Sequence, residues 1–421
     1  MIFKAMRIFT LLFAGSFFTL FSFGQLSVSS GQGKIYDDFG GADFYVAMFN
    51  NITVSSEIKY TGIETDIEWY KYDDSFVSNQ VYFSPESATG YYLKNTLTDA
   101  KMLSVWVVDY NDYLPMFTSL AVDESAENRC EKTKLLLTAD NIAPLTYKTS
   151  ATSTERAIYR AYTITYNSLE WNEQWQPIEK KQTVDAEDVI FEISESPLCN
   201  TQFTLTADDE YSIALGITPS EISTNEYSAV AVACKATTVT STRSEKNEDE
   251  RPETAEKLSG SAPLDILFKT NPTDAVSYYK WSIHKNGELL ITRTMEEFRH
   301  TFSEAGKYKV LITVSNTSCS ARDSITVDVS ESALWIPNAF SPNGDGANDE
   351  FRVAYRSLAS FECTVYNRWG RRVYSSNDPS KGWDGTIGGK PAAAAPYFYV
   401  VNAVGTDGRK YSRKGDINLL R

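Results

Sequence analysis

The chain has 421 residues, is 13% aromatic with 25 Tyr, and has a formal net charge of −15. This length allows several separate hydrophobic cores, and the abundance of Tyr, Thr and Val favours sheets over helices. Residues 351–421 hold 12 Lys and Arg against 5 Asp and Glu, a net charge of +7, which leaves −22 for residues 1–350. Such an acidic body argues against nucleic acid as a partner.

The first 24 residues have the pattern of a secretory signal peptide. Lys4 and Arg7 precede an uncharged run that ends in small residues, and this order predicts cleavage after residues 1–24, with a mature chain that begins near Gln25. A membrane helix needs about 20 apolar residues. No later stretch is apolar enough, so we expect no transmembrane segment in the mature chain, and Cys130, the first cysteine, is too distant to accept a lipid at the cleavage point.

Residues 25–125 are expected to form a first β-sandwich. Short runs of aromatic and β-branched residues, among them 67–72 and 103–108, are separated by polar clusters, as in strands joined by turns. The spacing from Trp69 to the later aromatic strands is similar to that of an immunoglobulin-like sheet with a core tryptophan, although no cysteine pair flanks it.

Residues 126–240 are expected to form a second immunoglobulin-like sandwich, whose last strand runs from Ser228 to Cys234. Five cysteines in a secreted chain permit two disulfides. Cys130 and Cys199 each lie just before an alternating run, so both are placed at strand ends where they can pair, while Cys234 shares an apolar face and is expected as a buried free thiol. Spacing alone leaves the pairing open.

Residues 241–257 are rich in charge and lack core-forming residues, which predicts a solvated linker. In residues 258–332, Asn286-Gly287 separates two alternating runs, the strongest short-range signal for a hairpin. The aromatic-x-Trp run at Tyr279 and the alternating run 306–316 resemble those of a PKD-like domain. The resemblance implies an immunoglobulin fold that acts as a spacer or as a module contacting carbohydrate or protein.

The segment from Trp335 to the C-terminus contains five motifs in order. A strand enters a loop rich in Gly, Asn and Asp at 341–349, and residue types that favour positive φ or local hydrogen bonds alternate there. Aromatic strands joined by Gly-bearing turns follow, at 363–374, 383–386, 397–401 and 414–421.

These motifs closely resemble the gliding-motility-associated C-terminal domain, the type B sorting domain of type IX secretion substrates. The resemblance implies that residues 333–421 form a C-terminal β-sandwich sorting domain, that the type IX secretion machinery is a partner, and that the chain crosses the outer membrane of a Gram-negative cell to the surface. The motif residues are Pro337, Asn338, Phe340, Ser341, Pro342, Asn343, Gly344, Asp345, Gly346, Asn348, Asp349, Asn367, Arg368, Trp369, Gly370, Trp383, Asp384, Gly385, Gly415 and Arg421.

Two features of this segment have alternative interpretations. The 341–349 loop matches positions 3, 5 and 6 of a calcium-binding EF-hand but lacks its first and last ligands, which leaves a noncanonical cation site as the alternative to a loop closed by its own hydrogen bonds. Trp369, Trp383 and Tyr399 are expected to pack in the core or against turns. Arg368 and Arg371 are expected to be solvated, with a contact to the secretion machinery as the alternative.

The sequence offers little for catalysis. His284 and His300 are the only histidines and neither has metal-ligand spacing, and no nucleophile elbow, phosphate loop or dinucleotide fingerprint occurs. We therefore expect an all-β, non-enzymatic surface protein without a cofactor, built of tandem immunoglobulin-like sandwiches, with an adhesion or scaffold role and a surface glycan or protein as ligand. The alternative is a carbohydrate-binding or glycan-degrading protein with its site in residues 25–240, since carboxylate pairs are defined only in three dimensions.

Overall fold

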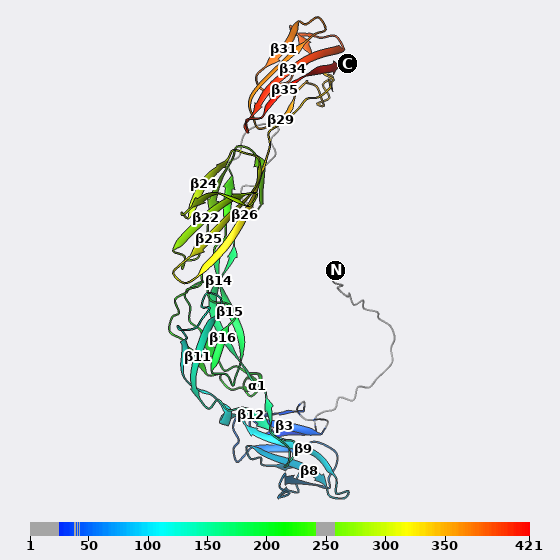
Figure 1. Cartoon of the computed structure of the whole chain (residues 1–421). Helices are drawn as coiled ribbons and strands as arrows, with labels where there is room; N and C mark the ends of the chain where they lie inside the picture. The colour runs from blue at the N-terminus through cyan, green and yellow to red at the C-terminus, as the bar shows by residue number, and fades with distance from the viewer. Residues whose placement is uncertain (1–24, 38, 40, 42, 241–256) are drawn as a thin grey trace, which may run out of the picture.

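The computed structural model describes residues 25–37, 39, 41, 43–240 and 257–421. The expected signal peptide and all but the last residue of the expected linker lie outside these residues. Four β units follow one another along an elongated, bent molecule (Figure 1). The two helices of the described residues are the 3-10 turn η1 (Tyr110–Tyr113) and α1 (Glu210–Ala214). The all-β class is confirmed.

The N-terminal unit is a sandwich of a six-stranded sheet, ordered β2-β3-β9-β8-β5-β6, and a three-stranded sheet, ordered β1-β4-β7. Trp69 is fully buried between the sheets, with its ring 4.5 Å from that of Phe83, so it is the core tryptophan that the sequence predicts. The strands are β1 (Leu26–Ser30), β2 (Gly33–Tyr36), β3 (Phe44–Phe49), β4 (Glu57–Tyr60), β5 (Ile67–Lys71), β6 (Phe76–Ser78), β7 (Tyr82–Phe83), β8 (Thr89–Asn95) and β9 (Lys101–Asp109).

The second unit packs sheet β10-β11-β16 against sheet β15-β14-β17-β18. The strand expected from Ser228 to Cys234 is wrong: this segment crosses to the third unit, and Cys234 makes only an isolated bridge to Pro272 there. The strands are β10 (Met116–Val122), β11 (Thr133–Asp140), β12 (Leu145–Tyr147), β13 (Arg156–Ile158), β14 (Ala161–Asn172), β15 (Gln174–Asp185), β16 (Ile190–Ile193), β17 (Thr204–Thr206) and β18 (Glu221–Ser223), of which β12 and β13 form a separate hairpin.

The third unit packs sheet β19-β21-β24 against sheet β20-β26-β25-β22-β23. The hairpin β22–β23 turns at Asn286 and Gly287, both with positive φ (51° and 88°), as a two-residue type I′ turn requires. β19 precedes the charged segment in the chain yet pairs with β21. The strands are β19 (Thr237–Thr240), β20 (Lys257–Ser261), β21 (Leu264–Lys269), β22 (Tyr278–Lys285), β23 (Glu288–Arg293), β24 (Glu297–Phe302), β25 (Gly306–Ser315) and β26 (Ser320–Ser330).

The C-terminal unit is built on a five-stranded sheet, ordered β28-β35-β34-β30-β31, with the short pairs β27-β29 and β32-β33 beside it. Its core gathers Phe340, Phe351, Val365, Trp383 and Ile417. The strands are β27 (Ala333–Trp335), β28 (Ala339–Phe340), β29 (Ala354–Arg356), β30 (Leu358–Tyr366), β31 (Arg372–Ser376), β32 (Thr386–Ile387), β33 (Lys390–Pro391), β34 (Ala395–Gly405) and β35 (Lys410–Leu419).

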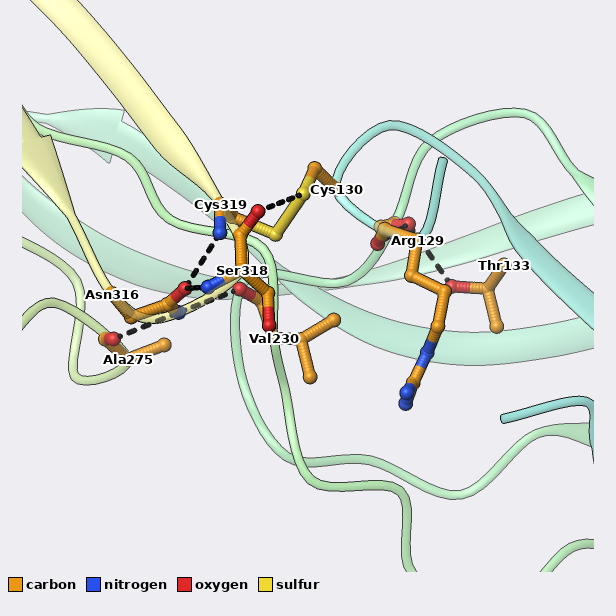
Figure 2. The surroundings of a disulfide bond; sticks show 9 residues. Arg129, Cys130, Thr133, Val230, Ala275, Asn316, Ser318 and Cys319 are labelled. Atoms are coloured by element: carbon orange, nitrogen blue, oxygen red, sulfur yellow. Dashed lines mark hydrogen bonds between the residues drawn. A yellow bond between two sulfur atoms is a disulfide. The ribbon is translucent and has the colours of Figure 1, made fainter. Parts of the chain in front are cut away.

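A disulfide joins the second and third units (Figure 2). Cys130 is bonded to Cys319 at the turn between β25 and β26, at a sequence separation of 189, so the expected Cys130–Cys199 pairing is wrong. The physical reason is that Cys130 lies on the loop before β11, which faces the third unit. Cys199 and Cys234 are free thiols, and burial raises the pKa of Cys234 to about 12.

Candidate sorting surface

The C-terminal unit has one end beside the third unit and one free end. At the joined end, β30 and β34 pair at Leu358 and Gly405, and the next residue, Thr406, donates a hydrogen bond from Oγ1 to the carbonyl of Ala262 in the third unit. The other end of this ladder, at Tyr366 and Phe398, lies at the far end of the molecule (Figure 1). We refer to it as the free end.

The loop 341–349 leads out of β28 at the free end and is closed by its own side chains. The carboxylate of Asp349 accepts the N–H of Gly344 at 2.7 Å and of Gly346 at 2.8 Å. Both glycines have positive φ, the backbone that brings the two amides onto one carboxylate. Ser341 N–H donates to the carbonyl of Asn348 at 2.9 Å, which ties the two ends of the loop together.

The cation hypothesis has no support in this geometry. Asp345 accepts the N–H of Ala347 and the side-chain amide of Asn343, both at 2.8 Å, and these bonds lower the pKa of its carboxyl group. Both oxygens of Asp349 are likewise used by backbone amides. Within the described residues, no group of three or more His, Cys, Asp or Glu side chains is arranged to hold a metal.

Trp383 and the turn after it fix the 341–349 loop to the body of the unit. Trp383 is 1% exposed and donates from Nε1 to the carbonyl of Thr386 at 2.8 Å, so its predicted core role is confirmed. Asp384 caps the turn by accepting the N–H and hydroxyl of Thr386. A Cβ on Gly385 would lie 3.0 Å from side-chain atoms of Pro342 and Leu419, so only glycine leaves room for this contact.

The C-terminal strand β35 also reaches the free end of the unit. It pairs with β28 and the residue before that strand, since the carbonyl of Asn338 accepts the N–H of Asn418 and the carbonyl of Phe340 accepts the N–H of Leu420. Arg421 donates to the carbonyl of Gly385 at 3.2 Å. Gly415 lies further along β35, where a Cβ would fall 2.7 Å from the hydroxyl of Tyr399. The structure therefore brings most of the predicted motif residues together, and Gly415 serves the packing of Tyr399.

The turn 367–371 between β30 and β31 differs from the expectation. Asn367 Oδ1 accepts the N–H of Trp369 at 3.1 Å and of Arg371 at 3.0 Å, and Gly370 takes a φ of 79°. Trp369 is 75% exposed, with the Arg368 guanidinium 4.3 Å from its ring centroid. The prediction that Trp369 packs in the core or against a turn is wrong, because the turn points its indole outward.

Residues 334–419 match the CHU_C type IX secretion signal domain. The chain carries a type IX secretion signal domain at its C-terminus. This signal domain is preceded by a match to the PKD domain over residues 255–329 and a match to the fibronectin type III domain over residues 121–224. The resemblances drawn from the sequence for the third and C-terminal units are thereby confirmed, and the signal domain supports secretion by the type IX pathway.

Solved structures with a similar run of β units share little sequence with this chain. A tetra-tandem repeat in the extending region of a large adhesion protein is 11% identical, with a TM-score of 0.22 and coverage of 90% of this chain and 100% of that one. A Ca²⁺-stabilised adhesin that helps an Antarctic bacterium reach out and bind ice is 11% identical, with a TM-score of 0.21 and coverage of 87% of this chain and 93% of that one. Immunoglobulin domains 1–5 of Sidekick-1 are 10% identical (TM-score 0.23, 92% and 80% covered). No curated protein matches the chain.

A cleft of about 410 Å³ lies where the loop between β12 and β13 meets the N-terminal sheet. Its walls include Tyr72 and Tyr92, and the Lys101 ammonium lies 5.3 and 5.1 Å from their ring centroids. Burial lowers the pKa of Lys101. The two carboxylates of the cleft are both engaged: Asp74 accepts the hydroxyl of Tyr92 at 2.7 Å, and Asp99 pairs with Lys94.

Proposed function

We propose that this chain is a non-enzymatic surface protein with an adhesion or scaffold role, exported by the type IX machinery through its C-terminal signal domain. The observation behind the proposal is the position of that domain at one end of a row of sandwiches, with its motif residues at the free end. The other three units then form the exported part, which extends away from the signal domain. Immunoglobulin-like, fibronectin type III and PKD modules are typical of spacers and binding proteins rather than of catalysts.

Deletion of residues 335–421 in the native host tests the export step. We expect the truncated chain to accumulate in the periplasm, because the other units lack the signal, and cell fractionation followed by surface proteolysis measures this. The control is the full chain with Tyr159→Ala, since Tyr159 is an exposed residue far from the signal domain. Surface display of the truncated chain at the level of the control would refute the sorting role.

A second candidate function is binding of carbohydrate in the cleft at Tyr72 and Tyr92. Tyrosine rings and mixed hydroxyl, amine and carboxylate groups are the side chains that bind sugars in shallow sites. The carboxylates of Asp74 and Asp99 already have partners, which favours binding over hydrolysis. A glycan screen with the full chain, together with an assay for released reducing sugar, separates these two activities.

A further inference from the structure

Trp369 is an unusual residue for a solvated turn. Its indole is 75% exposed, at the tip of the β30–β31 hairpin and at the end of the molecule that no other unit covers (Figure 1). A tryptophan side chain buries roughly 150–250 Å² when a partner covers it. Covering a large apolar ring that stays in water in the free chain is favourable, because its apolar surface is removed from water.

The turn holds this indole in one orientation. The side chain of Asn367 accepts the backbone N–H groups of Trp369 and Arg371, and the N–H of Gly370 donates to the Asn367 carbonyl at 2.9 Å. The Arg368 guanidinium covers part of the ring at 4.3 Å. Because these contacts exist before binding, the turn loses little conformational entropy when a partner binds to it.

The charges around the indole indicate the chemistry of the partner. In the described part of the chain, no carboxylate lies within ion-pair distance of Arg368, Arg371 or Arg372. Two carboxylates at the same end, those of Asp349 and Asp384, accept hydrogen bonds from backbone amides. Three arginines thus remain available for external anions, while the carboxylates of Asp349 and Asp384 are committed to their own loops.

We propose that the turn 367–372 is the point at which the signal domain docks onto an acidic protein surface of the export machinery, with the Trp369 indole in an apolar pocket and the arginines facing carboxylates. Trp and Arg are the residues most enriched at the energetic centres of protein interfaces. An indole beside the polar loop 341–349 and three arginines fits a protein surface that offers both an apolar pocket and carboxylates. This inference rests on the proposed export function.

The test compares two exposed tryptophans of the same domain. Trp369 lies at the free end, whereas Trp335, 56% exposed on β27, is the matched control. We expect full-length Trp369→Ala to reach the surface of the native host about tenfold less than wild type, as loss of an anchor tryptophan costs at least that factor in affinity. Trp335→Ala should be displayed normally, and both variants should keep the thermal unfolding midpoint of the wild type.

A second variant separates charge from folding. Arg371→Glu should lower export as Trp369→Ala does. Arg413→Glu, at an exposed position of β35, should leave export unchanged. If Trp369→Ala and Arg371→Glu are exported normally while deletion of 335–421 still blocks export, the docking site is wrong and the sorting role stands. If both variants are exported but shed from the cell, the turn contacts a surface lipid or glycan, and the export contact is refuted.

Discussion

The N-terminal and second units meet through an apolar core, whereas the second and third units meet through a disulfide, a few hydrogen bonds and Val230, which packs against the cores of both units. In the first joint, the ring of Tyr147 on the β12–β13 hairpin lies 5.5 Å from that of Phe44, and its hydroxyl donates to the Phe39 carbonyl at 2.6 Å. The other buried residues of this N-terminal joint are Val46, Met48, Trp106, Val108, Tyr110, Leu145, Ile158, Tyr211 and Leu215.

The second joint is made of single contacts around the Cys130–Cys319 bond. Asn316 donates from its side-chain amide to the carbonyls of Val230 and Ala275, at 2.9 and 3.1 Å (Figure 2). On the tip of the β14–β15 hairpin, Trp175 donates from Nε1 to the carbonyl of Asn271 at 3.0 Å. This joint therefore has a covalent bond and far fewer apolar contacts than the N-terminal joint.

The two joints respond differently to their surroundings. An apolar joint forms wherever the chain folds, because its stability comes from surface removed from water. A disulfide forms and persists only in an oxidising compartment, which agrees with secretion. We expect the two joints to be weakened by different changes, and three experiments separate them, in order of decreasing effect.

Tyr147→Ala should have the largest effect. It leaves a cavity in the N-terminal joint and removes the hydrogen bond to Phe39, and loss of a buried aromatic ring costs about 3–5 kcal/mol. The free energy of unfolding from urea titration measures this, and small-angle scattering reports whether the first two units separate. Tyr159→Ala, a change at an exposed tyrosine just after the same hairpin, is the control. Equal stability of the two variants would mean that the apolar contact does not hold the joint.

Cys319→Ser should have the next largest effect. Loss of a native disulfide costs about 2–4 kcal/mol in typical domains, and the contacts of Asn316 and Trp175 remain to hold part of the joint. Scattering should show a wider range of angles between the second and third units, with the N-terminal joint unchanged. Cys199→Ser removes a free thiol and should change neither property. A non-reducing peptide map of wild type that links Cys130 to any residue other than Cys319 would contradict the structure.

Local signals explain how much of the fold the sequence predicts. The Asn286-Gly287 turn was predictable because two adjacent residues with positive φ define it. Trp69 was placed in a core because it alternates with other apolar residues in a strand, and it is fully buried. The loop 341–349 was also predictable, since its hydrogen bonds join residues a few positions apart.

Contacts between units could not be predicted in this way. Cys130 was paired within its own unit because spacing holds no information on which loops of different units meet, and its partner is 189 residues away. Trp369 was expected to pack in the core or against a turn, yet it is exposed. Its exposure depends on the direction of a hairpin turn, which Asn367 sets by two hydrogen bonds. The segment 228–234 alternates like a strand, yet it passes between units.

Mild acid should have the smallest effect, and it should destabilise the third unit but not the N-terminal joint. Both histidines lie in the third unit, and the N-terminal joint contains none. His300 on β24 is half-buried with its ring edge-on to Phe302 at 4.6 Å. Burial lowers the pKa of His300 below its ordinary value of 6.5, and the charge of Arg293 acts in the same direction, while Asp265 opposes them.

The direction of the stability change with pH follows from proton binding to the folded and unfolded chain. As the pH falls below about 6.5, the unfolded chain takes up a proton at His300 while the folded unit remains neutral, so the third unit loses stability relative to higher pH. The unfolding midpoint of the third unit should therefore decrease between pH 7.5 and pH 5.5, and His300→Gln should reduce this decrease, whereas His284→Gln should leave it in place. An unchanged decrease in His300→Gln, or an earlier loss of the N-terminal joint, would show that other groups govern the acid response.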